Sequence, residues 1–184
     1  NATLKGLEFD LQLQFRKMRN FMKGVVFSAN LTLMDSKMNY FETLKSRIKN
    51  PDFTPGGTEK PFLPTNSDII YTDRLLKQPS LLFNVSLGYD YKKFSGRISC
   101  NYQDGVLIAE QHRQDAADVE STRPFVKWDM QLKYSLTRQF SLYATLSNFT
   151  QSSDRKRRDI TNYPSRVEYY GSAAYIGFKY DIFK

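Results

Sequence analysis

A period of two between apolar and polar side chains is the feature that most constrains this 184-residue chain. Successive side chains of a β-strand point to opposite faces, so this period predicts strands with one apolar and one polar face. In residues 7–16 every odd position is apolar and every even position is polar or charged. A helix with this pattern would bury charged side chains along with apolar ones, so the pattern argues against a helix here.

The same pattern recurs along the chain, and we expect seven strands. They cover about residues 7–16, 25–34, 81–91, 95–103, 126–136, 140–147 and 174–182. Short turns are expected near 17–24, 92–93 and 137–139, and long loops over about 35–79, 104–123 and 150–166. Prolines and glycines mark the first long connection as a loop, in which we expect a short helix at Asn39 to Ile48.

Strand length and the alternation of connections favour an antiparallel up-and-down transmembrane β-barrel over a soluble β-sandwich. The clearest strands have about ten residues or more, enough to cross a bilayer at a tilt, whereas sandwich strands have about five or six. Outer-membrane barrels alternate tight periplasmic turns with long outer loops. Aromatic residues near the predicted strand ends, such as Tyr91, Phe94 and Trp128, suit the two membrane interfaces.

The strand count predicts that the chain is part of a larger barrel. With the short turns in the periplasm, the first strand begins outside and the seventh ends inside. Closed bacterial barrels have an even number of strands and normally both ends inside, so seven strands are expected to be a fragment. The chain has no signal peptide, which leads us to expect that an N-terminal part is missing.

Composition and motifs narrow the classes of function. The net charge is +8, but the positive charges are scattered apart from the run Arg155 to Arg158, so we expect no nucleic-acid partner. Cys100 is the only cysteine, so no internal disulfide can form, and we expect it to be a small apolar residue facing lipid. The sequence contains no recognisable triad, phosphate loop or catalytic carboxylate pair, so we expect neither enzymatic activity nor a cofactor.

Candidate site residues lie on the predicted polar faces. The charged residues expected to face the barrel lumen, as ligand contacts or as a hydrogen-bonded inner wall, are Glu8, Asp10, Arg97, Lys127, Asp129 and Lys133. His112 lies among Glu110, Asp115, Asp118 and Glu120 without convincing metal-ligand spacing, so a solvated loop is favoured over a metal or haem contact. The run Arg155 to Arg158 either meets lipopolysaccharide phosphates or another anion, or is a solvated loop, which is favoured.

Five short motifs occur in order along the chain: a G-x-E strand at residues 2–9, a P-x-x-P-S entry at 76–80 with its first proline replaced, an x-D-x-x-x-x-Y strand at 128–134, a strand end l-x-x-x-x-N-l-t-n at 142–150, and a closing Y-x-x-G-R-x-y-x-x-G strand at 169–178. Together they resemble strands of TonB-dependent outer-membrane receptors. Ser172 stands where that last motif often has arginine. Family barrels usually end on an aromatic residue, whereas Phe183 is penultimate here.

The resemblance covers nearly the whole chain except the long loops, and it implies a function. Residues 1–184 are similar to the C-terminal part of a receptor barrel of 22 strands in the bacterial cell outer membrane, without its plug domain and signal peptide. The activity implied is TonB-driven uptake of a scarce small nutrient, such as a siderophore, haem, a vitamin or a glycan. The implied partners are outer-membrane lipid, the plug of the same protein, the nutrient ligand, and the TonB complex acting through the missing N-terminal part. A passive porin-like barrel and a soluble β-rich interaction module remain as alternatives.

Overall fold

The computed structural model is an all-β protein and describes residues 1–15, 20–113, 116–158 and 163–182. A short 3-10 helix, η1, spans Asn20–Gly24. The strands are β1 (Ala2–Gln14), β2 (Val25–Lys49), β3 (Phe62–Asp73), β4 (Leu81–Tyr91), β5 (Phe94–Gln103), β6 (Leu107–Arg113), β7 (Ala116–Thr122), β8 (Phe125–Ser135), β9 (Phe140–Ser147), β10 (Ser153–Arg158), β11 (Pro164–Tyr169) and β12 (Ala173–Tyr180). Within these described ranges, no helix has the length and apolar content needed to span a membrane.

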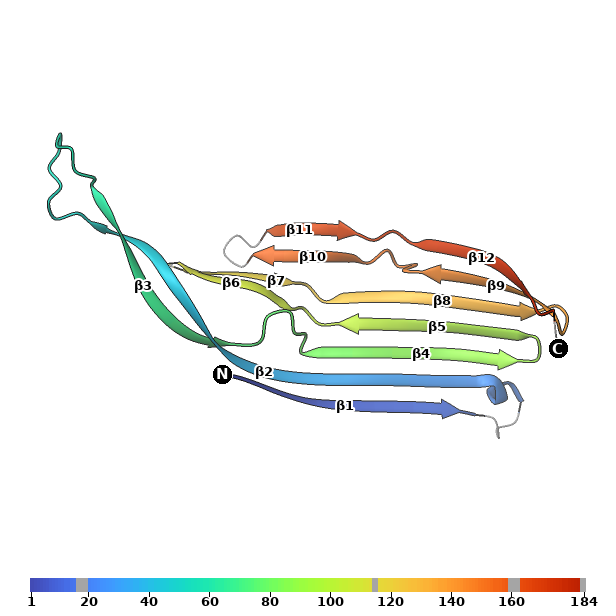
Figure 1. The fold of residues 1–184 in the computed structure, drawn as a ribbon. Coiled ribbons are helices and arrows are strands. Elements are labelled where there is room, and N and C mark those ends of the chain that lie inside the picture. The colour runs from blue at the N-terminus through green and yellow to red at the C-terminus, as the bar shows by residue number, and fades with distance from the viewer. Residues whose placement is uncertain (16–19, 114–115, 159–162, 183–184) are drawn as a thin grey trace.

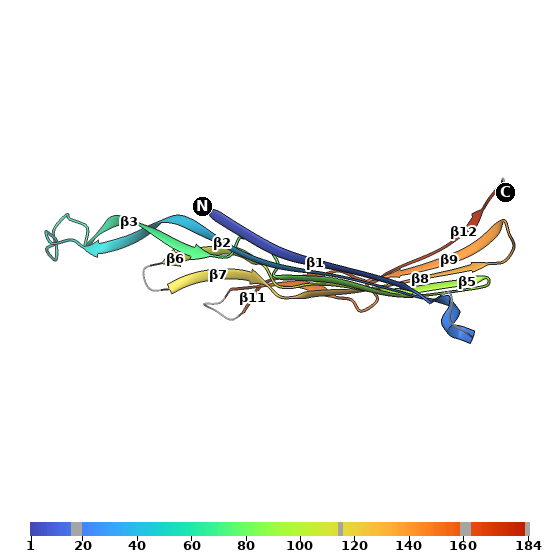
Figure 2. The same cartoon turned by 90° about the horizontal axis from the view of Figure 1, so that it is seen from below.

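The main sheet is an antiparallel meander in the order β1-β2-β4-β5-β8-β9-β12, with β3 paired to the far part of β2 (Figure 1). These seven strands coincide with the seven predicted segments, so the all-β prediction is confirmed. The sheet is open, since β1 and β12 each pair with one neighbour within the described residues. Figure 2 shows the sheet edge-on as a thin layer, in which the start of β1 and the end of β12 rise to the same side.

The loop predicted over residues 35–79 and the helix predicted at Asn39 to Ile48 are both wrong. β2 continues without a break to Lys49 and pairs with β3 from Met38↔Asp73 to Lys49↔Phe62, which gives a long hairpin extending beyond the main sheet (Figure 1). Polar side chains occur on both faces of this hairpin, so the alternation that reveals a strand in sequence is weak here.

The loops predicted over 104–123 and 150–166 also contain strands. β6, β7, β10 and β11 form a second antiparallel sheet in the order β11-β10-β7-β6. Figures 1 and 2 show this sheet continuing past the ends of β5, β8, β9 and β12 rather than covering a face of the main sheet. Backbone hydrogen bonds join its strands where they leave the main sheet, from Thr122 N to Val106 O at 2.8 Å and from Arg123 N to Arg155 O at 2.8 Å.

The described part of the chain has almost no hydrophobic core. Its only buried apolar side chains are Cys100, Val106 and Leu107, and large apolar side chains are widely exposed. Phe178 is 69% exposed and Ile176 is 87% exposed. A single layer cannot bury its own apolar side chains, so this sheet needs another medium or partner against one face.

The two faces of the main sheet differ sharply. The apolar face carries the odd-numbered side chains of β1, β4 and the first nine residues of β2, together with the even-numbered side chains of β5, β8, β9 and β12. The polar face carries the alternate side chains. The strand register places apolar residues of neighbouring strands next to one another. One cross-strand row of the apolar face contains Leu13, Phe27, Leu87, Ile98, Met130, Leu146 and Ala174.

Candidate functional site

All six candidate residues predicted from sequence lie on the polar face. The register places Asp10 and Lys127 in one cross-strand row, which passes through Asn30, Asn84 and Asn101. The next row contains Gln12, Ser28, Ser86, Ser99 and Asp129. Glu8 accepts a hydrogen bond from Asn30 Nδ2 at 3.1 Å. Arg97 and Lys133 lie farther toward the short turns, in register with Gln131 and Ser95 respectively.

Lys127 and Asp129 are brought together as part of a polar cluster where β8 begins and β9 ends. Lys127 Nζ lies 3.2 Å from Asp129 Oδ2. The other carboxylate oxygen of Asp129 accepts hydrogen bonds from Ser147 Oγ at 2.9 Å and from Asn148 N at 2.8 Å. Hydrogen bonds to charged groups are stronger than neutral ones, so this cluster fixes the end of β9 against β8.

Asn148 is the centre of the turn that follows β9. Its side chain is buried and its φ angle is 50°, a left-handed conformation that asparagine tolerates better than most residues. Asn148 Nδ2 donates to Tyr170 O at 2.6 Å, and Asn148 Oδ1 accepts from Ser152 N at 3.1 Å. The side chain thereby joins the turn after β9 to the segment leading into β12, while the backbone N–H of Asn148 links the turn to Asp129 of β8.

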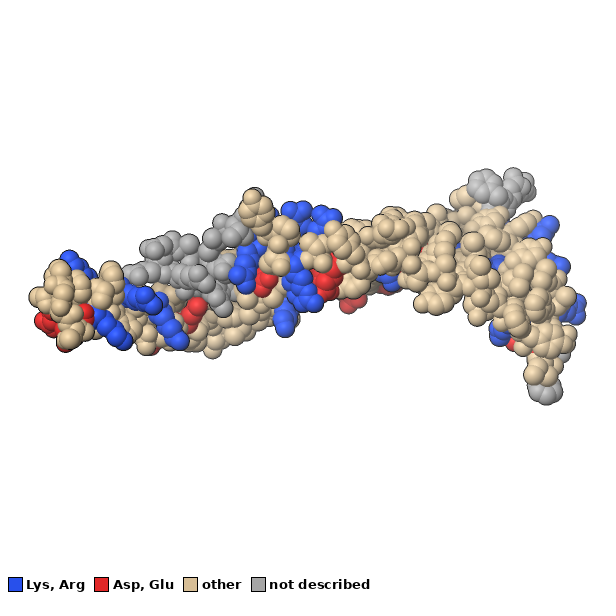
Figure 3. Space-filling model, turned by 90° about the horizontal axis from the view of Figure 1, so that it is seen from above, with Lys and Arg blue, Asp and Glu red and all other residues tan. Residues whose placement is uncertain are grey.

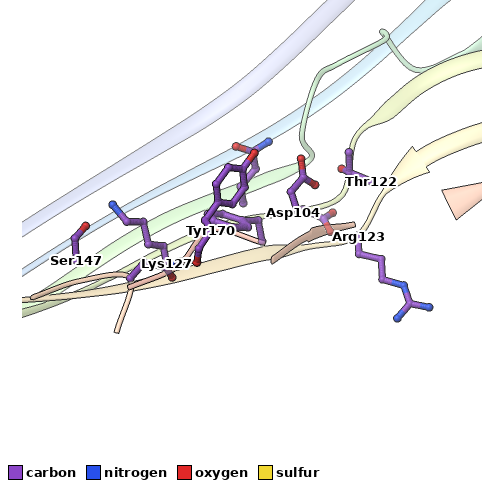
Figure 4. Close-up of a pocket in the computed structure, with 11 residues that line it drawn as sticks. Asp104, Thr122, Arg123, Lys127, Ser147 and Tyr170 are labelled. Carbon is purple, nitrogen blue, oxygen red and sulfur yellow. Dashed lines mark hydrogen bonds between the residues drawn. The ribbon is translucent and has the colours of Figure 1, made fainter. Parts of the chain in front are cut away.

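A pocket of about 530 Å³ opens beside this turn, where the main sheet meets the second sheet. Its lining residues are Gln103, Asp104, Thr122, Arg123, Phe125, Lys127, Ser147, Asn148, Asp154, Tyr170 and Gly171. Figure 4 shows Asp104, Lys127, Ser147 and Tyr170 projecting to one side of the strands, while the side chain of Arg123 points the opposite way.

The pocket combines an aromatic wall with charges of both signs. The rings of Phe125 and Tyr170 meet edge to face, with centroids 6.3 Å apart. Asp104 and Asp154 supply acceptors, and Lys127 supplies a cationic donor. An apolar wall with a few polar groups is typical of a small-molecule site, and this set suits a polar ligand with its own donors and acceptors.

A charged cluster lies next to the pocket on β11. Tyr170 Oη donates a hydrogen bond to Glu168 Oε2 at 2.6 Å, and Arg166 forms an ion pair with Glu168. The hydrogen bond from Tyr170 lowers the pKa of Glu168, and the positive charges of Arg166 and Lys156 lower it further. The same hydrogen bond raises the pKa of Tyr170, because the phenol is favoured in its neutral, donating form.

Tyr170→Phe is expected to raise the pKa of Glu168. The native carboxylate has a depressed pKa, so its contribution to stability is present above the unfolded value of about 4.3 and is lost as the pH falls through the folded value. Removing the phenol removes the largest cause of that depression. Titration of the Glu168 carboxyl carbon by NMR in the intact protein measures the shift. An unchanged or lower pKa in the variant would contradict the role assigned to Tyr170.

Two further predictions from the sequence have different outcomes. The side chains of residues 110–118, including His112, Glu110, Asp115 and Asp118, lie outside the described residues, so that cluster stays untested. Among the side chains that are described, no group of three or more His, Cys, Asp or Glu is placed to hold a metal ion. Cys100 lies on the apolar face between Val85 and Trp128, and it is buried.

Sequence reasoning selected Lys127 and Asp129 but did not select Asn148, Tyr170 or Asp104 as site residues. Asn148 and Tyr170 did stand in two of the family-like motifs, so a signal for them was present. Asp104 has no such signal, because only the strand register brings the end of β5 to the start of β8.

No family model, curated protein or solved structure matches this chain in the comparisons made.

Proposed function

We propose that the main sheet is part of the wall of an outer-membrane β-barrel belonging to a TonB-dependent receptor, which imports a scarce small nutrient. The apolar face carries this proposal. Between the row containing Phe9 and the row containing Tyr91, the described residues place no charged side chain on that face. The polar face of the same strands carries charged residues from Glu8 to Lys133. Lipid on one side and water on the other account for this separation.

The dimensions of the apolar face fit a bilayer. From Leu81 to Tyr91 the apolar side chains of β4 extend over ten residue steps, or about 33 Å of strand. A tilt of about 40° reduces this to about 25 Å, the height of the apolar band on outer-membrane barrels. Figure 3 looks onto the edge of the structure formed by β11 and β12, where a belt largely free of charge lies between the charged second sheet and charges at the short-turn end.

Aromatic rings lie toward both ends of the apolar face. At the end near the second sheet, Phe83 and Tyr102 stack with ring centroids 4.7 Å apart. At the short-turn end, Phe140 and Phe178 lie 5.8 Å apart, and Tyr134 belongs to the same row as Phe178. Rings at two levels with mainly aliphatic rows between them are typical of the aromatic girdles of membrane barrels.

The open edges support a larger barrel. Unpaired backbone groups of β1 and β12 would each cost several kcal/mol in hydrocarbon, so we propose that further strands of the whole protein pair with both edges. The polar face then lines the lumen, where Asp129 and its neighbours meet the plug. The pocket beside Asn148 opens toward the outer side and would contact the incoming nutrient.

Labelling of the apolar face tests the barrel directly. Spin labels placed singly at Leu11, Leu31, Phe83, Leu132, Leu142 and Phe178 in the intact protein are expected to be relaxed mainly by lipid-soluble oxygen. Labels at Ser28, Ser86, Gln131 and Thr145 on the polar face serve as matched controls, and a water-soluble nickel complex should relax these more strongly. If water-soluble relaxant dominates at most sites of the apolar face, that face is not in lipid and a soluble β-rich module replaces the barrel.

Energy dependence separates a receptor from a passive pore. Cells that produce the protein are supplied with radiolabelled ferric siderophores, haem, cobalamin or oligosaccharides, each far below millimolar concentration. We expect one of these to accumulate only when the TonB complex is intact. Accumulation that is unchanged after deletion of TonB would favour the porin-like alternative.

A further inference from the structure

The positive residues of β10 lie beside a second pocket, separate from the one described above. Asp154 and Tyr170 line the pocket on the Lys127 side. Arg155, Lys156 and Arg157 line a different pocket of about 210 Å³, together with Arg123. The run predicted as a solvated loop is a strand, and its ladder with β11 is irregular between Lys156 and Arg157.

Among the described residues that line the second pocket, here called the arginine pocket, every charged side chain is basic. Its lining residues are Arg123, Arg155, Lys156, Arg157, Pro164, Val167 and Tyr169, with no carboxylate among them. Arg123 and Arg155 are exposed, and Tyr169 is 77% exposed beside them. On the other side of the same strands, Arg166 forms an ion pair with Glu168. Like charges gathered beside an apolar wall are suited to a ligand that is anionic and partly apolar.

The arginine pocket lies just beyond one end of the apolar face. Arg123 is three residues from Val126, which belongs to the apolar row of Phe9, Leu31, Phe83 and Tyr102. Three residues of extended chain span about 10 Å. Figure 4 shows Arg123 pointing away from Lys127, which stands on the polar face, so Arg123 projects on the same side as the apolar residues.

We propose that the arginine pocket binds the phosphate groups of lipid molecules in the outer leaflet. This inference rests on the proposed barrel, since only there does the apolar face put lipid next to Arg123. Guanidinium groups hold phosphate through forked, charge-assisted hydrogen bonds, and basic pockets at membrane height recognise lipid headgroups. Arg155 Nε donates to Ser153 Oγ at 3.0 Å, which orients a guanidinium that has further donors for a phosphate. Val167 and Tyr169 would contact the apolar part of the same lipid.

The test uses the intact protein, extracted from its membrane in mild detergent. The probe is bisphosphorylated lipid A, compared with lipid A stripped of its phosphates, and the Kd is measured in mixed micelles. We expect the triple variant Arg123→Gln, Arg155→Gln and Arg157→Gln to bind bisphosphorylated lipid A roughly tenfold more weakly or worse. Lys45→Gln, Arg47→Gln and Lys49→Gln form the matched control, because they remove three charges from one side of the β2–β3 hairpin, and this control should bind like the wild type.

Each contrary result overturns the inference in its own way. A triple arginine variant that binds like the wild type, or a hairpin control that weakens equally, removes the arginine pocket as the site. Full competition by inorganic phosphate at the same concentration would make it a site for soluble anions. The corresponding lysine variants keep the charge and should retain intermediate affinity, which checks that the glutamine variants are folded. If the spin labels show the apolar face in lipid and the triple arginine variant still binds lipid A like the wild type, this inference alone is refuted. If the labels show that face in water, the barrel itself is refuted.

Discussion

Replacement of Ile98 by arginine is expected to lower the free energy of unfolding of the intact protein by roughly 2–4 kcal/mol. Ile98 lies midway along β5 on the apolar face, in register between Leu87 and Met130. In the proposed barrel, an arginine there would have to place its guanidinium in hydrocarbon near the middle of the bilayer, or distort the bilayer to reach water. Denaturant unfolding from lipid vesicles gives the free-energy difference.

The adjacent residue supplies the control for this substitution. Ser99→Arg adds the same side chain to the polar face, between Ser86 and Asp129. In the proposed barrel this arginine would face the water-filled lumen next to the carboxylate of Asp129, so the substitution should lower the free energy of unfolding much less than Ile98→Arg does. Equal losses for the two variants would mean that the two faces do not meet different media, which is incompatible with the barrel.

Asn148→Ala is expected to destabilise the protein by roughly 2–4 kcal/mol, from lost hydrogen bonds and from alanine in a left-handed conformation. The substitution removes the bonds to Tyr170 O and Ser152 N and leaves both groups without this partner in the turn. Asn148→Gly loses the same bonds, but glycine adopts the positive φ freely. The glycine variant should therefore be about 1 kcal/mol more stable than Asn148→Ala. Thermal and denaturant unfolding compare the two variants.

A control variant at another asparagine distinguishes the loss of the turn's hydrogen bonds from the general effect of losing a side-chain amide. Asn101 lies on the polar face within β5 and forms none of these bonds to the turn, so Asn101→Ala is the control. It should change stability by less than the Asn148 variants do. If Asn148→Ala proves no more costly than Asn101→Ala, the turn does not depend on the buried side chain.

The seven strands of the main sheet were predictable because each has one apolar and one polar face. That alternation depends only on local sequence, so no knowledge of neighbouring strands is needed. The β2–β3 hairpin was missed because Tyr40, Leu44 and Ile48 are spaced by four, which fits a helix as well as one face of a strand. A long-range contact favours the strand over the helix, because Tyr40 stacks on Tyr71 with ring centroids 5.3 Å apart. Pro64 also indicated a loop, although an edge strand such as β3 tolerates proline.

The candidate site was predictable only as a face, not as a cluster. Charged residues at alternate positions marked Lys127 and Asp129 as polar-face residues. Their partners Ser147 and Asn148 come from the next strand, so their proximity depends on the register of β8 with β9. That the run Arg155 to Arg158 belongs to a strand was hidden for a similar reason, because nothing in that basic run identifies one.

The unbroken course of β2 determines how far the hairpin reaches. One continuous strand of 25 residues is shared between the main sheet and the hairpin, without a flexible joint between them. From Met38 to Lys49 the ladder with β3 extends about 36 Å. A flexible tether would let the hairpin tip move over many distances from the sheet, whereas the continuous strand β2 holds the tip at a nearly constant distance and angle. In the proposed barrel, large particles approaching from the outer side would meet the turn around Gly56 before they reach the level of the pocket.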